Sequence, residues 1–202
     1  MVVIHKLKCI FIHIPKCAGT SVEQFLKDNN QNEIDFLGTY KNRSLHHLTS
    51  YELLMILRKK IFSKYYRFSI VRNPYERLLS EYYWTPINGI GYKTGGCKKT
   101  FLDYVSKVVR QKDFFSNIYN DHFMPQYNYL FYKDKLLINN IFKYESLDLV
   151  VSYLRKKFNI IRNFPMLNKR AENIEKEDWT IEEKELIYNI YEKDFILFNY
   201  DK

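Results

Sequence analysis

The stretch FIHIPKCAGTS, residues 11 to 21, decides how the rest of the sequence is interpreted. An apolar run typical of a buried strand stops at Pro15, and a lysine, a glycine and two hydroxyl side chains follow within six residues. Thr20 followed three residues later by Glu23 is the pattern of a capping box at a helix start. The stretch therefore predicts a buried strand over residues 9 to 14, a tight loop and a helix.

The loop between this strand and helix has the composition of an anion-binding loop. Gly19 lets the backbone approach a ligand closely, and the first amides of a helix, together with its dipole, attract negative charge. Lys16 adds a positive charge, and Thr20 and Ser21 add hydroxyl donors. The usual nucleoside triphosphate loop has its lysine directly after its second glycine, whereas Lys16 comes three residues before Gly19. By itself, the loop is equally consistent with a phosphate site and with an ordinary turn.

A second strand, loop and helix unit lies in RFSIVRNPYERLLSEYYW, residues 67 to 84. Asn73 suits a helix cap and Pro74 suits the first helical position. Arg72 ends the strand, and its guanidinium beside helix amides and the Ser80 hydroxyl would suit a second phosphate. Because ligands of parallel sheets bind beyond the carboxyl ends of the strands, the two loops predict one ligand with two separate phosphate groups.

The rest of the chain alternates between predicted strands and helices. Further helices are expected behind capping boxes at Thr49 and Thr180 and over residues 101–109 and 146–158, with a further strand within residues 137–144. This alternation predicts an α/β fold, a single P-loop-like domain over residues 1–202 with a central parallel β-sheet flanked by helices on both faces. The glycine-rich loop at residues 86–99 is interpreted as a mobile lid or as a variable surface loop.

Composition excludes a disordered chain and indicates an anionic partner. Hydrophobic residues make up 46% of the 202 residues and aromatic residues 17%, enough to build a core. The net charge of +9 fits a nucleotide, nucleic acid, a membrane surface or an anionic sugar, although scattered basic residues also suit an ordinary solvated surface. Three cysteines without a CxxC pair predict neither a disulfide framework nor a zinc knuckle, and a reducing compartment fits them best. The apolar amino-terminal segment, interrupted by lysines and too short for a bilayer, is interpreted as a buried strand.

Two motifs resemble those of one known family. FIHIPKCAGTSVEQFL, residues 11–26, resembles the 5′-phosphosulfate loop of sulfotransferases, and FSIVRNPYERLLSEYYW, residues 68–84, resembles their 3′-phosphate motif. Softer similarities extend the resemblance along nearly the whole chain, in HHLTSYELL, IFKYESLDLVVSYLRKKF, FPMLNKR and IYEKDFILFNY. The chain is most similar to the carbohydrate-type sulfotransferases of family 2, which include heparan and chondroitin sulfotransferases and small bacterial members. Cys17 stands where that family would have threonine, and Tyr144 departs from its usual pattern farther on.

The resemblance implies the reaction and its donor. A sulfuryl group would pass from 3′-phosphoadenosine 5′-phosphosulfate (PAPS) to a hydroxyl, or less often an amine, and leave adenosine 3′,5′-bisphosphate. Lys16 would act at the bridging oxygen, and no metal is expected. The residues implied around the donor are Lys16, Cys17, Ala18, Gly19, Thr20 and Ser21 at the 5′-phosphosulfate, Arg72 and Ser80 at the 3′-phosphate, and Asn168, Lys169 and Arg170 over the nucleotide.

The resemblance also requires a base that takes the proton of the acceptor. His47 is preferred because it precedes a predicted helix whose dipole favours a neutral imidazole. His46 is its immediate rival. His13 is expected to be a buried histidine of the core, and no metal site is predicted from His5 or His122. Cys17 is interpreted as a small residue that packs the loop rather than as a nucleophile.

Two other classes of function remain open. A nucleic-acid-binding module would explain the positive charge and the many tyrosines, but no nucleic-acid-binding motif occurs, and no nucleic-acid partner is expected. A kinase with an atypical P-loop is the other alternative, although the position of the lysine argues against an ordinary kinase loop. Under the sulfotransferase hypothesis the acceptor is expected to be a glycan or glycoconjugate. The sequence shows no signal peptide or membrane anchor, so a cytoplasmic protein is expected, and the oligomeric state stays open.

Overall fold

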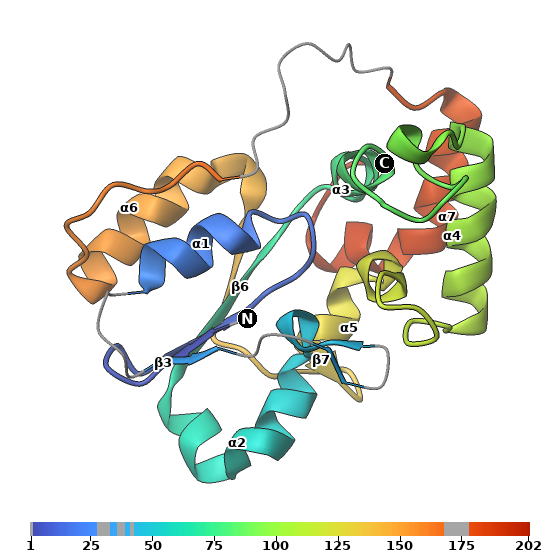
Figure 1. Cartoon of the computed structure of the whole chain (residues 1–202). Coiled ribbons are helices and arrows are strands. Elements are labelled where there is room, and N and C mark those ends of the chain that lie inside the picture. The colour runs from blue at the N-terminus through green and yellow to red at the C-terminus, as the bar shows by residue number, and fades with distance from the viewer. Residues whose placement is uncertain (1, 28–32, 36–38, 41–42, 168–177) are drawn as a thin grey trace. The chain divides into compact units, whose positions relative to one another are not determined.

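The computed structural model describes residues 2–27, 33–35, 39–40, 43–167 and 178–202 (Figure 1). By its internal contacts the chain divides into two compact units. The first unit is formed from residues 1–38, 45–71 and 128–172, and the second from residues 39–44, 72–127 and 173–202.

A five-stranded sheet organises the first unit, in the strand order β3-β1-β2-β6-β9. Its strands are β1 (Val2–Ile4), β2 (Cys9–Ile12), β3 (Glu33–Asp35), β6 (Tyr66–Val71) and β9 (Asn140–Lys143). β6 runs parallel to both β2 and β9, with Phe68 opposite Phe11 on one side and opposite Asn140 on the other. β1 pairs antiparallel with β2 and with β3. The predicted α/β fold with parallel central strands is therefore confirmed.

The amino-terminal segment was predicted as one strand, but it forms two antiparallel strands, β1 and β2. A turn from His5 to Lys8 separates β1 from β2, with the Lys8 amide donating to the His5 carbonyl at 3.1 Å and Lys8 in the left-handed region at φ 47°. Lys6 and Lys8 are exposed in this turn. The two lysines that interrupt the apolar run thus mark a hairpin, because a charged side chain is costly to bury within a core strand.

Helices cover the sheet of the first unit on both sides. They are α1 (Gly19–Leu26), α2 (Ser50–Lys64) and α6 (Leu147–Phe158). α1 and α6 lie side by side, with the Arg155 guanidinium 5.9 Å from the centre of the Phe25 ring, and α2 lies on the other side of the sheet (Figure 1). The capping box predicted at the start of α2 is confirmed, since the Thr49 hydroxyl accepts the Glu52 amide at 3.3 Å and the Glu52 carboxylate accepts the Thr49 amide at 2.8 Å.

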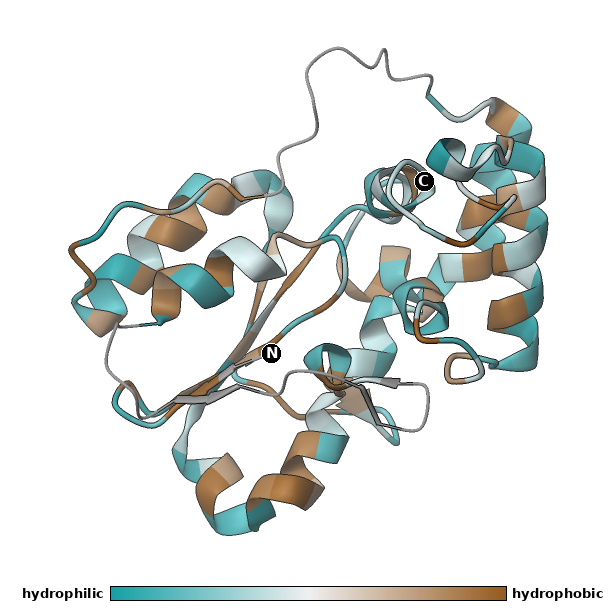
Figure 2. Ribbon diagram, viewed as in Figure 1, coloured by the Kyte–Doolittle hydropathy of each residue, from teal (hydrophilic) through white to brown (hydrophobic). Residues whose placement is uncertain are grey.

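The core of the first unit lies along its central strands. Apolar residues gather on β2 and β6 (Figure 2), where Ile10, Phe11, Phe68 and Ile70 are almost completely buried. Burial of each such side chain contributes about 1.5–3 kcal/mol. The buried hydroxyl of Ser69 on β6 is satisfied, because it donates to the Ile12 carbonyl at 2.7 Å. The smaller elements of this unit are η1 (Leu45–His47), β7 (Phe131–Tyr132), β8 (Lys135–Leu136) and η4 (Tyr144–Ser146).

The second unit is mainly helical. Its elements are β4 (Thr39–Tyr40), β5 (Arg43–Ser44), α3 (Pro74–Tyr82), η2 (Tyr92–Thr94), α4 (Lys98–Gln111), η3 (Asn120–Phe123) and α7 (Ile181–Leu197), and α5 (Gln126–Leu130) begins in it. Both predicted starts of long helices are confirmed, with Asn73 capping α3 ahead of Pro74 and a capping box of Thr180 and Glu183 on α7. Aromatic rings join these helices, as Trp179 lies 6.2 Å from Tyr82 between ring centres.

Hydrogen bonds hold the glycine-rich loop that precedes α4. The Thr94 hydroxyl donates to the Ile87 carbonyl at 2.7 Å, and the Gly89 amide donates to the Thr94 carbonyl at 3.2 Å. A β-carbon at Gly96 would lie 2.1 Å from the Ile90 carbonyl oxygen, so the chain folds back closely on itself there. The interpretation of this loop as a lid stays a prediction.

A buried carboxylate lies at the centre of the second unit. Asp194 of α7 accepts the amide of Gln126 at 2.7 Å and that of Tyr127 at 2.9 Å. Burial raises the pKa of Asp194 to about 6, although the nearby Arg77 guanidinium and the two amides oppose the shift. Arg77 is itself buried and donates to the Met124 carbonyl at 3.0 Å, so it serves the core of this unit.

The raised pKa of Asp194 predicts a pH-dependent stability. Because the folded value of about 6 exceeds the ordinary value of 3.8, the stabilising contribution of Asp194 is complete below pH 3.8 and is lost as pH rises through 6. Relative to Asp194→Asn, the wild type should therefore lose free energy of unfolding between pH 4 and pH 7. Urea unfolding of both proteins across this range measures the difference, and a difference that does not change with pH would contradict the assignment.

Candidate functional site

The loop between β2 and α1 has an unusual backbone. Lys16 and Ala18 both adopt the left-handed region, at φ 66° and 62°. This conformation costs an L-residue about 1–2 kcal/mol, and such strain gathers where a ligand must be held. Ala18 is the N-cap of α1 and makes no side-chain cap bond, so the amides of Gly19, Thr20 and Ser21 form the positive first turn of the helix.

The predicted capping box of Thr20 and Glu23 is wrong. The left-handed turn at Ala18 starts α1 at Gly19, which places Thr20 inside the helix with its side chain exposed. Glu23 is buried and accepts a hydrogen bond from Nδ1 of His13 at 2.8 Å. The carboxylate therefore serves the interior of the unit rather than the end of its own helix.

His13 packs directly against the glycine of the loop. A β-carbon at Gly19 would lie 2.1 Å from both Cδ2 and Nε2 of the His13 ring. His13 is buried, as expected for a core histidine, and burial lowers its pKa below 6.5, although the hydrogen bond and charge of Glu23 oppose the shift. The ring is therefore neutral at pH 7. Gly19 is required at this position by the imidazole, a constraint that the sequence interpretation had not included.

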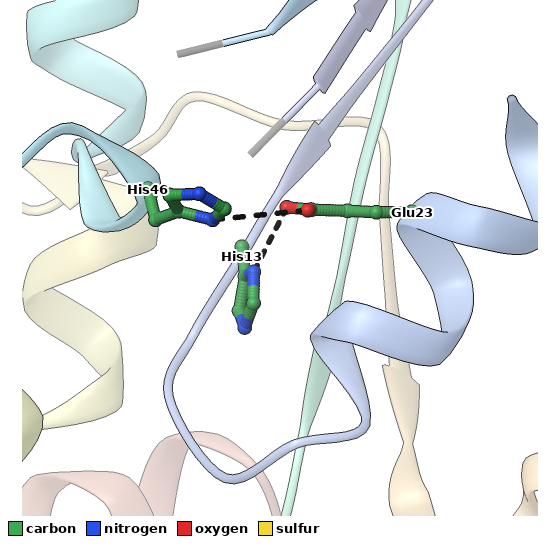
Figure 3. Close-up of side chains that lie close together, drawn as sticks. All are labelled: His13, Glu23 and His46. Atoms are coloured by element: carbon green, nitrogen blue, oxygen red, sulfur yellow. Dashed lines mark hydrogen bonds and ion pairs between the residues drawn. The ribbon is translucent and has the colours of Figure 1, made fainter. Parts of the chain in front are cut away.

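The two candidate bases lie beside His13. His46 and His47 belong to η1, which comes just before α2, and their ring centres lie 6.1 and 5.1 Å from that of His13. His46 has a side chain one third exposed and places Nδ1 3.8 Å from Oε2 of Glu23 (Figure 3). His47 is buried. Through His13, the first unit thus brings both histidines next to the loop that carries Lys16.

Two other residues of the predicted anion-binding loop are held by hydrogen bonds. Cys17 is buried and its thiol donates to the Pro15 carbonyl at 3.6 Å, in agreement with its interpretation as a packing residue. The Ser21 hydroxyl accepts the Leu167 amide at 3.0 Å, which brings the chain before residue 168 to the start of α1. The predicted nucleotide contacts Asn168, Lys169 and Arg170 lie outside the described residues.

The second predicted loop belongs to the second unit. The Arg72 side chain is mostly buried and pairs with Glu76 of α3 at 3.3 Å, and Ser80 is half-buried on the same helix. The Gln126 side chain accepts the Arg72 amide at 2.9 Å and donates to the Arg72 carbonyl at 2.8 Å. Since Asp194 holds the amide of Gln126, a buried chain of hydrogen bonds fixes the backbone of the predicted phosphate-binding arginine.

Sequence reasoning missed Glu23, Gln126 and Asp194 as supports of the two predicted loops. Glu23 was assigned to a helix cap, and no motif marks the other two. The only signal was a polar side chain within an apolar stretch, as at Asp194 in KDFILF, and this pattern does not reveal the partner. Among the described residues no helix is both long and apolar enough to cross a membrane.

The contact between His13 and Gly19 predicts opposite results for two neighbouring substitutions. Gly19→Ala forces the His13 ring to move, so the free energy of unfolding should fall by about 1–3 kcal/mol. Ala18→Gly removes left-handed strain and should leave the stability unchanged or raise it by up to about 1 kcal/mol. Chemical denaturation measures both. A Gly19→Ala protein as stable as the wild type would show that the ring does not require this glycine.

Comparison with known proteins adds the family. A model of the sulfotransferase family matches residues 1–201, whereas no curated protein and no solved structure matches the chain. The match covers both strand, loop and helix motifs and continues through α7. The predicted resemblance is therefore confirmed, and this chain belongs to the sulfotransferase family.

Proposed function

We propose that this protein transfers the sulfuryl group of PAPS to a hydroxyl of a glycan or glycoconjugate. The observation that carries the proposal is the grouping, in one unit, of a strained lysine loop at a helix start with two histidines. The loop offers what a bound phosphosulfate requires, and a histidine offers what an attacking hydroxyl requires. Membership of the sulfotransferase family supports the same reaction.

The reaction assigns a role to each loop. The acceptor oxygen attacks sulfur, the bond from sulfur to the bridging oxygen breaks, and adenosine 3′,5′-bisphosphate leaves. Lys16 stabilises the charge that develops on the bridging oxygen, and the amides of the first turn of α1 hold the 5′-phosphate. The residues proposed to bind the donor are Lys16, Cys17, Ala18, Gly19, Thr20, Ser21, Arg72, Ser80, Asn168, Lys169 and Arg170.

The proton of the acceptor hydroxyl passes to a histidine of η1. The sequence favours His47, because the positive end of α2 favours a neutral imidazole. In the structure both His46 and His47 precede α2 and adjoin His13. A base in either position receives one proton for each sulfuryl group transferred, and no metal is needed for this step.

The nature of the acceptor rests on charge and on aromatic residues. The net charge of +9 suits an acceptor that is itself anionic. In the second unit the side chains of Trp84 and Tyr92 are exposed, and such rings commonly stack on sugars. We therefore propose a glycan as the acceptor. Three cysteines without a CxxC pair suit a reducing compartment, so we propose the cytoplasm as the location.

Removal of the Lys16 ammonium should slow transfer strongly without unfolding the protein. For Lys16→Ala we expect turnover to fall by about 10²–10³, because charge on the bridging oxygen would lose its stabilisation. The measurement is transfer of label from radiolabelled PAPS in a screen of sugar acceptors. Lys60→Ala, which removes an exposed lysine from α2 of the same unit, is the matched control and should behave as the wild type. Near wild-type turnover of Lys16→Ala would remove Lys16 from the mechanism.

The role of Arg72 can be tested without an acceptor. Arg72→Ala should weaken binding of adenosine 3′,5′-bisphosphate about 10- to 100-fold, because it removes charged hydrogen bonds to the 3′-phosphate. Binding of AMP, which lacks that phosphate, should change little. Calorimetry with both ligands gives the comparison, with Arg110→Ala on the exposed face of α4 as the control. Equal losses for the two ligands would place Arg72 elsewhere on the nucleotide.

A further inference from the structure

A cluster of two histidines and one glutamate lies beside the loop in the first unit. His13, Glu23 and His46 place one nitrogen or oxygen atom each within 4.8 Å of one another (Figure 3). They come from three elements, because His13 follows β2, Glu23 lies on α1 and His46 lies in η1. The two oxygens of the carboxylate serve different histidines, with Oε1 2.8 Å from His13 and Oε2 3.8 Å from His46.

Glu23 is ionised within this cluster. Burial opposes its charge, but the hydrogen bond from His13 is the largest effect in the other direction, and the pKa of Glu23 is lowered to about 2. Burial keeps His13 neutral at pH 7. The pair therefore carries a negative charge, and this charge lies within ion-pair distance of the His46 ring.

The two histidines of η1 differ in how well they meet the requirements of a general base. A base must reach the acceptor, and its protonated form must be stabilised in the transition state. The side chain of His46 is one third exposed and faces the Glu23 carboxylate, whereas His47 is buried. His47 is the nearer of the two to the His13 ring, at 5.1 Å between ring centres. The greater exposure of its side chain favours His46 as the histidine that an acceptor can reach.

We propose that His46 is the base and that Glu23 is the positioning residue that orients it and stabilises its protonated form. The inference rests on the proposed sulfuryl transfer. Nδ1 of His46 carries the hydrogen that faces Glu23, so Nε2 is the atom that receives the proton of the acceptor hydroxyl. As the bond from oxygen to sulfur forms, the proton moves to Nε2 and the imidazolium pairs with the carboxylate. His13 holds the carboxylate in place through Oε1, much as a third residue orients the histidine of a catalytic triad.

The grouping of these three side chains can be explained without a metal ion. His13 and Glu23 already satisfy each other at 2.8 Å, a normal length for a charge-assisted hydrogen bond. A metal ion would have to break that bond and displace the proton on Nδ1 of His13. The three side chains therefore fit a base, His46, beside a carboxylate that His13 holds by a hydrogen bond.

The experiment compares Glu23→Gln, His46→Gln and His47→Gln. His46→Gln should lower turnover by about 10²–10⁴, the usual contribution of a general base, and His47→Gln should lower it less. Glu23→Gln should lower turnover about 10-fold or more and move the acid limb of the pH profile to lower pH, because the protonated ring loses its partner. Binding of adenosine 3′,5′-bisphosphate should stay within about threefold of wild type in all three variants, since none of these side chains is assigned to the donor.

A second readout does not need an acceptor. The ring protons of His46, followed by nuclear magnetic resonance, should titrate at a lower pH in Glu23→Gln than in the wild type, with His13 and His47 followed alongside because their rings lie next to that of His46. Glu23→Asp should restore part of the turnover, because the charge is retained at a greater distance. Asp134→Asn removes an exposed carboxylate from the same unit and is the matched control.

The outcomes separate this inference from the proposed function. A larger loss of turnover in His47→Gln than in His46→Gln would overturn the choice of His46, and an unchanged His46 titration in Glu23→Gln would overturn the role of Glu23. Either result leaves sulfuryl transfer intact. A wild-type protein that binds adenosine 3′,5′-bisphosphate no better than AMP and accepts no label from PAPS would overturn the proposed function itself, and the base with it.

Discussion

The contact of the His13 ring with Gly19 is the constraint on which the donor loop and the candidate base both depend. Because glycine has no β-carbon, the ring occupies the space that any other residue would fill. In this position it donates to Glu23 and lies next to both His46 and His47. One buried imidazole therefore joins the end of β2, the first turns of α1 and the turn before α2. A side chain at position 19 would therefore displace the His13 ring, which lies next to both candidate bases.

The sequence predicted best the features that depend on neighbours along the chain. The caps of α2 and α7 follow from a threonine and a glutamate three residues apart, and Thr49 and Thr180 make the expected bonds. The same spacing at Thr20 failed. There the backbone of Ala18 starts the helix early, and Glu23 finds a buried partner on another element. A local pattern cannot distinguish these cases, because the competing partner is brought in only by the fold.

The residues of the candidate site also divide into those that local sequence identifies and those that only the fold identifies. Lys16 and Arg72 could be selected from the sequence because each follows a strand and precedes a helix, a position that the chemistry of phosphate binding favours. Their supports could not be selected. Gln126 reaches Arg72 across 54 positions of the chain and Asp194 reaches Gln126 across 68. Such contacts carry no short-range periodicity, so they appear only when the packing of the second unit is known.

Each unit has a buried carboxylate behind a predicted phosphate loop, and their environments suit them to different tasks. Asp194 accepts hydrogen bonds from neutral amides, and burial raises its pKa to about 6. Its charged form is therefore poorly stabilised, and its role is to fix the backbone. Glu23 faces imidazoles, which can gain a proton, and its pKa is lowered to about 2. A carboxylate that stays charged in a buried place costs free energy unless nearby positive charge offsets it. That offset becomes largest when the facing imidazole takes up a proton, which happens when the base accepts the proton of the acceptor hydroxyl.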